Sequence, residues 1–383
     1  MSDATMISRA LGRRQRMSAE YPAHAGDPTA SIASPSSCVV ERVLVVGLGS
    51  IGRRHARIAR LVRPGASIAA WRHRRSDGSL PAGLDTVAWS LDEALAFAPQ
   101  AAVIASPASH HLAAARALAR EGVHLLIEKP LADRADGVEE LIAECAQRSL
   151  VLMTGYNLRF LPSLQHFRDV VVSGAAGDVL SVRAEAGQYL PSWRPDVAYR
   201  DSVSARASLG GGVLLELSHE FDYLQWIFGN VAWVQAIATR QSLLDIDVED
   251  TAHVVLGFAQ SSTRAPLIAN VSLDFLRHDS TRCCTVIGSE GTLRWNAITG
   301  VVDIFRAGGS AWEQLVAAPV ERDATYVAEW RAFLACIESG ATVPVDGVAG
   351  LATLQIVEAA RQSSETLAVV RLGAPRPVSV SAR

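Results

Sequence analysis

The chain has 383 residues, of which 49% are hydrophobic and 20% are charged, and its formal net charge is −3 at pH 7. This length and composition predict a globular protein of two domains with a large buried core. They give no reason to expect nucleic acid or a membrane as a partner, and no apolar run reaches the ~18 residues of a membrane-spanning helix.

The first 40 residues are rich in Ser, Ala, Pro and Arg and lack hydrophobic periodicity, which predicts a disordered tail over 1–40. Met17 is a candidate start within it. Arg13-Arg14 suggests an export signal, but no apolar stretch follows, so we do not expect export. The five cysteines form neither a CxxC pair nor a zinc-ligand spacing. We therefore expect a reducing, cytoplasmic location and no metal.

Short apolar strands then alternate with helices over residues 41–157. This alternation is typical of right-handed βαβ units and predicts an α/β Rossmann domain with a doubly wound parallel sheet. The expected strands are 42–46, 67–71, 101–106, 124–129 and 150–154, and the expected helices are 53–62, 107–120 and 137–147.

Strands dominate the rest of the chain, 158–383, with few helices between them. The expected strands are 179–188, 231–239, 252–258, 267–274, 282–287, 291–295 and 301–305, and the expected helices are 215–226, 325–338 and 348–365. This order predicts an α+β domain with an open, mostly antiparallel sheet that binds substrate. Since an open sheet leaves a broad face to cover, a homodimer or homotetramer is expected.

A glycine-rich turn, Gly47-Leu-Gly-Ser-Ile-Gly52, follows the first strand and begins the first helix. Gly47 permits the tight turn, Gly49 lets the backbone approach a pyrophosphate, and Gly52 allows close helix–strand packing. The backbone of Ser50 and Ile51 then presents helix N-terminal N–H groups to the phosphates. In this context the motif predicts a dinucleotide site.

The residues after the second strand indicate which dinucleotide is bound. An NAD site places an acid there for the ribose hydroxyls, whereas this chain has Trp71-Arg72-His73-Arg74-Arg75 and no acid before Asp77. Guanidinium groups at Arg72 and Arg74 suit a 2′-phosphate. NADP is therefore favoured over NAD, although Arg is also the default basic residue of this chain.

Lys129 is the only lysine among the 36 Lys and Arg residues. Arginine stays protonated and cannot exchange a proton near neutral pH, so a lone lysine in an arginine-rich chain is a candidate for chemistry. Glu128-Lys129-Pro130 ends a strand of the first sheet, and ligands of open α/β sheets bind outside the carboxyl ends of the strands. Lys129 is thus expected where a nicotinamide and a substrate meet.

The order of motifs resembles the glucose–fructose oxidoreductase/inositol dehydrogenase (Gfo/Idh/MocA) family. The resemblance runs from residue 42 to about 365 and rests on seven segments: Gly47 to Gly52, Ser106-Pro107 with His111, Glu128-Lys129-Pro130, Gly155 to Phe160, Gly210 to Asp222, Val248 to Thr251, and Gly288 to Thr292. It implies a Rossmann domain joined to an open-sheet domain, with the active site between them. It also implies cofactor contacts for Ser106, Pro107, His111, Glu128 and Lys129.

The resemblance further implies that Lys129 acts as acid/base with an Asp and a His that follow the triple glycine. The family's usual spacing leaves three residues between them. Here Glu216 stands in place of the Asp, and His219 follows after only two residues. Since residues three apart share one helical face, both can still reach the site. The alternative for His219 is a helix N-terminal histidine bonded within the core.

Two further groups are candidate substrate contacts. Asn157 and Arg159 lie just after the domain junction. The alternative, which is nearly as well supported, is that they cap the loop there. An insertion rich in aromatic residues and Arg supplies Trp193, Arg194, Tyr199 and Arg200. The two arginines suggest an anionic group on a sugar-like substrate, as in members of the family from acidic-sugar pathways. An oligomer-contact arm is the alternative.

The sequence therefore predicts an NAD(P)-dependent oxidoreductase that moves hydride between nicotinamide and a carbinol or carbonyl carbon of a sugar, polyol or nucleotide-sugar. Two alternatives stay open. One is an imine or enone reductase, or a dehydrohalogenating lyase-type enzyme, on the same scaffold. The other is a dinucleotide-binding protein without turnover, which would have no need to keep a titratable lysine at the site.

Overall fold

The computed structural model describes residues 39–72, 79–194, 198–259, 266–319 and 321–373. The tail expected over 1–40, apart from its last two residues, lies outside this part of the chain, and so does Arg74. No helix among the described residues is long and apolar enough to cross a bilayer.

The first sheet has six parallel strands in the order β3-β2-β1-β4-β5-β6, which is the strand order of dinucleotide-binding folds. The strands are β1 Arg42–Val46, β2 Ser67–Trp71, β3 Thr86–Ala88, β4 Ala101–Ile104, β5 His124–Glu128 and β6 Leu152–Gly155. Every residue of β4 is buried, as expected for a strand covered on both faces. The predicted Rossmann fold is confirmed, with β3 as the strand that the sequence analysis missed.

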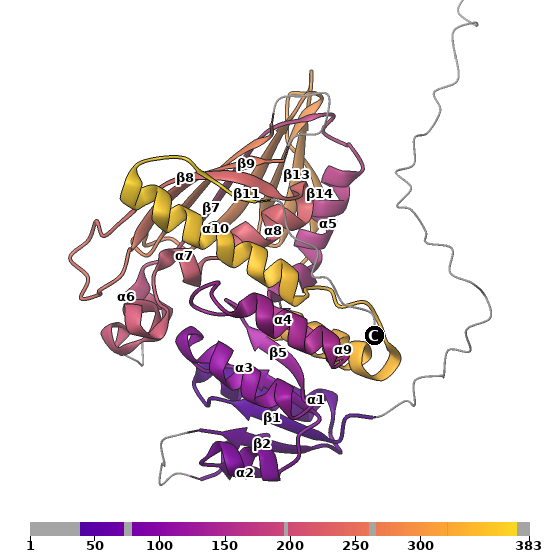
Figure 1. Cartoon of the computed structure of the whole chain (residues 1–383). Helices are drawn as coiled ribbons and strands as arrows, with labels where there is room; N and C mark the ends of the chain where they lie inside the picture. Colours follow the sequence, from indigo (N-terminus) through magenta and orange to yellow (C-terminus); the bar gives the residue numbers. More distant parts are fainter. Residues whose placement is uncertain (1–38, 73–78, 195–197, 260–265, 320, 374–383) are drawn as a thin grey trace, which may run out of the picture. The chain divides into compact units, whose positions relative to one another are not determined.

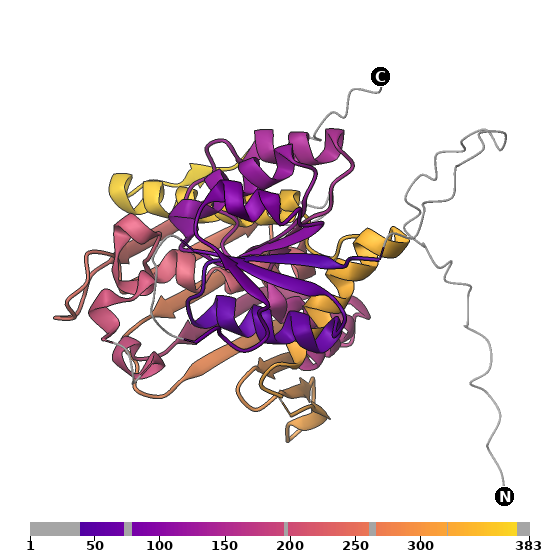
Figure 2. The same ribbon diagram turned by 90° about the horizontal axis from the view of Figure 1, so that it is seen from below.

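Helices cover both faces of this sheet (Figure 2). On the face of Leu44 and Val46 lie α2 Leu91–Ala96, α3 His111–Arg120 and α4 Val138–Gln147. On the face of Val43 and Val45 lies α1 Ser50–Val62, and beside it α9 Ala324–Ser339 buries Trp330 and Phe333. The helix α9 thus comes from the far end of the chain and completes the core of the first sheet.

Ion pairs hold α9 against α1. Asp323, the residue before α9, lies 3.4 Å from Arg54 Nε and 2.5 Å from Arg57 Nη2, and Glu338 pairs with Arg63 at the other end. Just beyond α9, the backbone of Asp346 forms a bridge with β6, the last strand of the first sheet. The division expected at residue 157 therefore separates the two sheets in sequence, while α9 returns to the first.

The second sheet has nine strands in the order β14-β13-β12-β11-β7-β10-β9-β8-β15. The strands are β7 Val179–Gly187, β8 Val231–Thr239, β9 Thr251–Phe258, β10 Ile268–Asp274, β11 Thr281–Gly288, β12 Gly291–Asn296, β13 Val301–Arg306, β14 Glu313–Ala317 and β15 Val370–Arg371. All neighbours are antiparallel except β7 and β10. The prediction of a mostly antiparallel sheet is confirmed.

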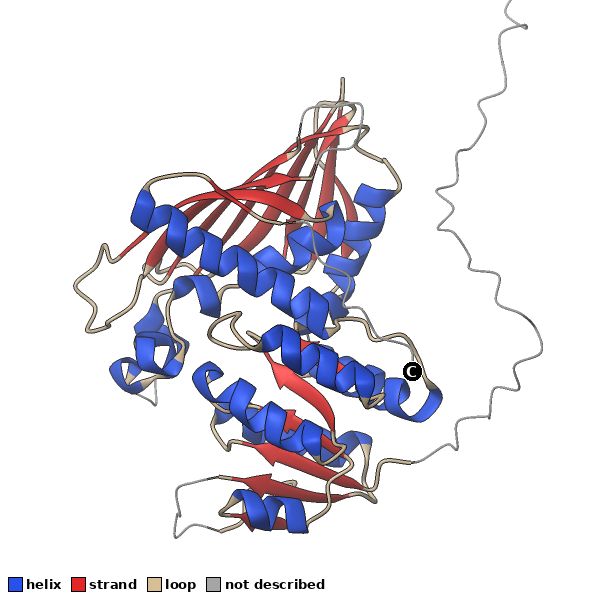
Figure 3. Cartoon of the chain, viewed as in Figure 1, coloured by secondary structure: helices blue, strands red, loops and turns tan. Residues whose placement is uncertain are grey.

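One face of the second sheet carries helices, as Figures 1 and 3 show. They are α5 Pro162–Val172, α8 His219–Phe228 and the long α10 Gly347–Thr366. Hydroxyl groups join α10 to β8, since Ser363 and Ser364 accept the backbone N–H groups of Ala236 and Ala238 at 2.9 and 2.8 Å. On the other face, Ile237 and Ile268 are 47% and 41% exposed in the described chain.

Candidate active site

The glycine turn has the geometry that a dinucleotide site requires. Gly47 has a φ of +90°, and a Cβ atom there would lie 2.9 Å from the Ser106 Cα atom. At Gly52 a Cβ atom would lie 2.0 Å from the Gly47 carbonyl oxygen, whereas at Gly49 nothing lies within 4 Å. Helix α1 then begins at Ser50 with no acidic residue in its first turn. These features fit a bound pyrophosphate on the open side of Gly49.

Two alanine substitutions separate folding from cofactor binding. Gly49→Ala is expected to change the free energy of unfolding by less than about 0.5 kcal/mol, because its Cβ atom meets open space. It should nevertheless raise the dissociation constant of NAD(H) or NADP(H) at least about tenfold, since the methyl group lies where the pyrophosphate approaches. Titration of cofactor fluorescence and urea unfolding measure the two effects.

Gly52→Ala is the matched variant, and its methyl group meets backbone. It should lower the free energy of unfolding by about 1–3 kcal/mol as well as weaken cofactor binding. Unchanged cofactor binding in Gly49→Ala would contradict a pyrophosphate site at this turn.

The turn after β4 is held by a buried histidine. His111 Nε2 lies 2.8 Å from the Ser106 carbonyl oxygen, and Nδ1 lies 3.0 Å from that of Pro130. The ring is 1% exposed, and burial lowers the pKa of His111, although both carbonyl groups oppose the shift. His111 therefore ties the turns after β4 and β5 together. The cofactor contact that the resemblance implies for His111 stays a prediction. The buried Ser106 hydroxyl has no hydrogen-bond partner among the described residues.

Arg72 directly follows β2, as the sequence analysis expected. Its backbone N–H donates to the Ala88 carbonyl oxygen at 3.1 Å, and its guanidinium carbon lies 5.8 Å from the centre of the Trp89 ring. The side chain is thus stacked beside the end of β2. Arg74 and Asp77 lie outside the described residues, so the rest of this segment stays a prediction.

Lys129 follows the last residue of β5, at the carboxyl end of the first sheet. Its Nζ atom donates to the Glu216 carbonyl oxygen at 2.8 Å and lies 3.6 Å from Glu216 Oε2. The two side chains are 18% and 16% exposed, so both are largely shielded while still open to solvent. The structure thus brings together two predicted residues that lie 87 positions apart in the sequence.

The segment that carries Glu216 and His219 differs from the single helix predicted over 215–226. Helix α7, Val213–Glu216, ends at Glu216, and α8 begins at His219 after a break at Leu217 and Ser218. The argument that both residues share one helical face is therefore wrong. The break instead turns the Glu216 carbonyl group toward Lys129, since this carbonyl has no helical partner and accepts the ammonium group.

His219 is buried at the start of α8, with its ring 5.5 Å from that of Tyr156 in an edge-on arrangement. Its Nδ1 atom is buried and has no hydrogen-bond partner among the described residues. Burial lowers the pKa of His219 well below its usual range, and the charges of Arg282 and Lys129 lower it further. His219 is therefore a neutral imidazole beside a lysine, able to donate or accept one hydrogen bond.

Two charged residues at this place were missed in the sequence analysis. Glu220, which is fully buried, accepts from Arg282 Nε of strand β11 at 2.7 Å. The charge of Arg282 acts on His219, so the pair forms part of the surroundings of the site. Glu220 directly follows His219, so its place near the site was predictable. Nothing in the sequence connects Arg282 with Glu220, which lies 62 residues earlier in the chain.

Asn157 and Arg159 form hydrogen bonds that connect different parts of the protein. The Arg159 guanidinium binds both oxygens of buried Asp222, at 3.0 and 2.7 Å, and the Asn157 amide donates to the Thr325 hydroxyl at 3.0 Å. Through Asp222 and Thr325 these contacts fasten the segment after β6 to α8 and to α9. Both side chains thus have structural partners, and their contact with a substrate stays a prediction.

The insertion between β7 and α7 folds onto a neighbouring loop. Trp193 donates to the Gln188 carbonyl oxygen at 2.9 Å, the Tyr199 hydroxyl accepts from Asp245 N at 3.2 Å, and Arg200 lies 4.0 Å from Asp245. A cavity of only about 10 Å³ lies between Trp193, Arg194 and Tyr199. This cavity has no room for a sugar, so the substrate contacts of these residues stay a prediction.

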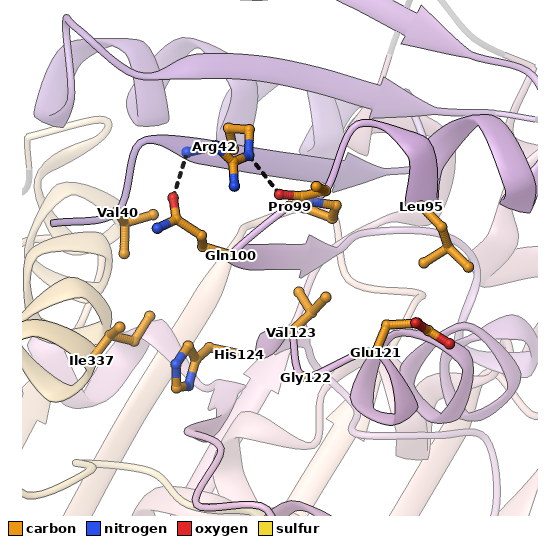
Figure 4. Close-up of a pocket in the computed structure, with 11 residues that line it drawn as sticks. Val40, Arg42, Leu95, Pro99, Gln100, Glu121, Gly122, Val123, His124 and Ile337 are labelled. Atoms are coloured by element: carbon orange, nitrogen blue, oxygen red, sulfur yellow. Dashed lines mark hydrogen bonds between the residues drawn. The ribbon is translucent and has the colours of Figure 1, made fainter. Parts of the chain in front are cut away.

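Larger hollows lie elsewhere among the described residues, and two of them have volumes of about 420 and 470 Å³. The first lies at the amino ends of the first sheet's strands, where Gln100 binds the Arg42 N–H group (Figure 4). The second is lined by Asp133, Glu249 and Arg361 among others. Neither is lined by Lys129 or His219. The first lies at the edge opposite to Lys129, because Lys129 follows the carboxyl end of β5.

Comparison with known proteins identifies the family. Residues 41–156 match the model of the oxidoreductase family with an NAD-binding Rossmann fold, and residues 164–294 match the GFO/IDH/MocA C-terminal domain. Together these matches cover more than half of the chain. The chain therefore belongs to the GFO/IDH/MocA family of oxidoreductases, as the order of its motifs predicted.

Individual relatives differ in how much of the chain they match. An uncharacterized oxidoreductase of Synechocystis sp. is 31% identical over 172 residues, which are 42% of this chain and about half (46%) of that protein. Myo-inositol 2-dehydrogenase of Thermotoga maritima is 25% identical over 86% of this chain and 98% of its own length. Levoglucosan dehydrogenase, solved with NADH and L-sorbose, shares the fold at a TM-score of 0.76 and 18% identity, over 87% of this chain and 98% of that one.

Proposed function

We propose that this protein is an NAD(P)-dependent oxidoreductase that transfers hydride between nicotinamide and a carbinol or carbonyl carbon of a sugar, polyol or nucleotide-sugar. The observation that carries the proposal is the contact of Lys129, at the carboxyl end of β5, with Glu216, which lies three residues before the buried His219. Sugar and polyol dehydrogenases among the relatives support the substrate class.

The dinucleotide, when bound, supplies the hydride acceptor or donor. The turn at Gly47, Gly49 and Gly52 and the N-terminus of α1 would hold its phosphates. NADP is the form that we favour, because Arg72 rather than an acid follows β2. The family model describes NAD binding, so both forms belong in the test.

Lys129 is the acid/base in this proposal. A carbinol oxygen must lose a proton as its carbon loses hydride, and a lysine amine in hydrogen-bond reach can take it. The Glu216 carbonyl oxygen, 2.8 Å from Nζ, holds the ammonium group in place. His219, as a neutral imidazole, donates a hydrogen bond to the same substrate oxygen and orients it.

Three finer features belong to the proposal. The substrate carries an anionic group, for which Arg194 and Arg200 of the insertion are the candidate partners. The enzyme is a homodimer or homotetramer, supported by the apolar residues Ile237 and Ile268 on the helix-free face of the second sheet. It works in a reducing compartment such as the cytoplasm, in agreement with four free thiols among the described residues.

A cofactor and substrate screen tests the proposal. NAD(H) and NADP(H) are each mixed with a panel of polyols, neutral sugars, uronates and nucleotide-sugars, and absorbance of the reduced nicotinamide is followed. Turnover with a carbinol or carbonyl substrate is the expected result. Cofactor binding without turnover on the whole panel, or turnover only with an imine, an enone or a halide substrate, would contradict it.

A further inference from the structure

Behind Lys129 lies a buried cluster of polar side chains that the proposed mechanism does not use. It contains His55 of α1, Glu128 at the end of β5, and Glu329 and Trp330 of α9. His55, Glu329 and Trp330 are 0% exposed, and Glu128 is 7% exposed. Three elements that are distant in sequence thus place four polar groups inside the protein, directly beside the proposed acid/base.

The hydrogen bonds in this cluster have only one possible direction. The Trp330 Nε1 group can only donate, and it lies 2.9 Å from His55 Nδ1, which must therefore accept. The proton of a neutral His55 ring then lies on Nε2, which donates to Glu128 Oε1 at 2.7 Å. The other oxygen of Glu128 accepts the Lys129 backbone N–H at 3.1 Å. Donors thus run from α9 through His55 to Glu128, and the Lys129 backbone donates to the same carboxylate from the other side.

The fourth residue of the cluster explains why the charge stays on Glu128. Neither carboxyl oxygen of Glu329 has a hydrogen-bond partner among the described residues. Burial, and then the negative charge of Glu128, raise the pKa of Glu329 well above its ordinary value. Burial also acts to raise the pKa of Glu128, but His55 and Lys129 outweigh it and lower the pKa. The hydrogen bond from His55 therefore favours the charge on Glu128, whereas no donor among the described residues supports a charge on Glu329.

We propose that Trp330 and His55 are positioning residues for Lys129, which act by holding Glu128 ionised and bound to the Lys129 backbone. This inference rests on the proposed function of Lys129 and adds residues that no motif assigned to it. Trp330 sets the tautomer of His55, His55 orients the Glu128 carboxylate, and Glu128 fixes the start of the turn that carries Lys129. Helix α9 thus controls the geometry of the site without touching a substrate.

The test compares two buried tryptophans that each donate one hydrogen bond. Trp330→Phe removes the donor to His55, and Trp295→Phe removes the donor to Ser163, at 3.1 Å in the core of the second sheet. Both variants lose packing and a buried hydrogen bond, so both should be less stable. We expect kcat to fall about tenfold in Trp330→Phe alone, with KM and the cofactor dissociation constant within about threefold of the wild type.

The pH dependence of kcat is a second measurement, which would not change if Trp330 only stabilised the fold. Without a fixed His55 tautomer the pKa of Glu128 should rise, because its main donor is weakened, so the acidic limb of kcat should shift to higher pH. The titratable groups that face Glu128 are His55, His111, Lys129, Tyr326 and Glu329. Trp295→Phe should keep the wild-type profile.

A second variant distinguishes a loss of positioning from a loss of folding. In His55→Gln the amide nitrogen can replace Nε2 as the donor to Glu128 without help from Trp330. This variant should keep most of the wild-type kcat, and adding Trp330→Phe to it should lower kcat less than twofold. Equal effects of Trp330→Phe in the wild-type and His55→Gln backgrounds would overturn the proposal.

Nitrogen NMR of the His55 ring separates this inference from the proposed function, because it needs no turnover. The wild type should show a protonated Nε2 and an unprotonated Nδ1, and Trp330→Phe should show a mixture of tautomers. A wild-type ring protonated on Nδ1 alone would overturn the inference, whatever the enzyme turns over. A correct tautomer in a protein without any turnover would instead contradict the proposed function.

Discussion

Lys129→Arg is expected to lower kcat about a thousandfold. The arginine keeps the positive charge beside Glu216, but its guanidinium stays protonated at neutral pH and cannot exchange a proton with substrate. General acid–base groups contribute about 10²–10⁴-fold, and Lys129 is the proposed group. The cofactor dissociation constant should change less than about threefold. Steady-state kinetics and cofactor titration on the same preparation measure both quantities.

The greater length of the arginine side chain is a second way for Lys129→Arg to lose activity, because Lys129 Nζ already lies 2.8 Å from the Glu216 carbonyl oxygen. Lys129→Met, which is shorter and uncharged, serves as the control and should lose as much kcat. In Lys129→Ala, added methylamine should restore part of the activity, since a small amine can occupy the vacated space. Turnover of Lys129→Arg within tenfold of the wild type would contradict the acid/base role.

Asp222→Asn is expected to lower the free energy of unfolding by about 3–5 kcal/mol. The substitution removes the carboxylate that binds two nitrogens of Arg159, at 3.0 and 2.7 Å, and leaves a guanidinium that is only 11% exposed without its partner. Breaking a buried pair on one side costs this much because the remaining charge stays desolvated. Urea unfolding followed by tryptophan fluorescence measures the loss.

The double variant Arg159→Met/Asp222→Leu should regain much of the lost stability, since both charges are then absent. Glu313→Gln is the matched surface control. It breaks the 3.1 Å pair with Arg306, in which both side chains are more than half exposed, and should change stability by less than about 1 kcal/mol. An equally small effect of Asp222→Asn would show that Arg159 finds another partner.

Much of the fold was predictable from sequence, because the signals were local. The strands 231–239 and 301–305 were expected from short, mostly apolar runs, and the structure has β8 at the first and β13 at the second. The helix α5 was missed although Pro162, at its first position, is a typical start of a helix. The break between α7 and α8 was missed because no glycine or proline marks it.

The site was predictable in part, for a similar reason. Lys129 and the glycine turn lie at the carboxyl ends of strands, where their positions follow from topology. Glu216 was named through the resemblance to the family alone. The partners of Arg159 and Arg200 did not follow, because an arginine in a loop has no pattern that identifies which carboxylate it will bind. The buried links of His55 with Trp330 and of Glu220 with Arg282 join residues that only the tertiary fold brings together.

The return of α9 to the first sheet has a consequence for the order in which the chain is made. A ribosome completes β6, the last strand of the first sheet, before it makes any strand of the second. The face that carries Val43 and Val45 is still without Trp330 and Phe333 at that moment, and α9 emerges only after β14. The nascent dinucleotide domain therefore exposes apolar surface throughout synthesis of the second sheet, which is the period when it most needs protection from aggregation.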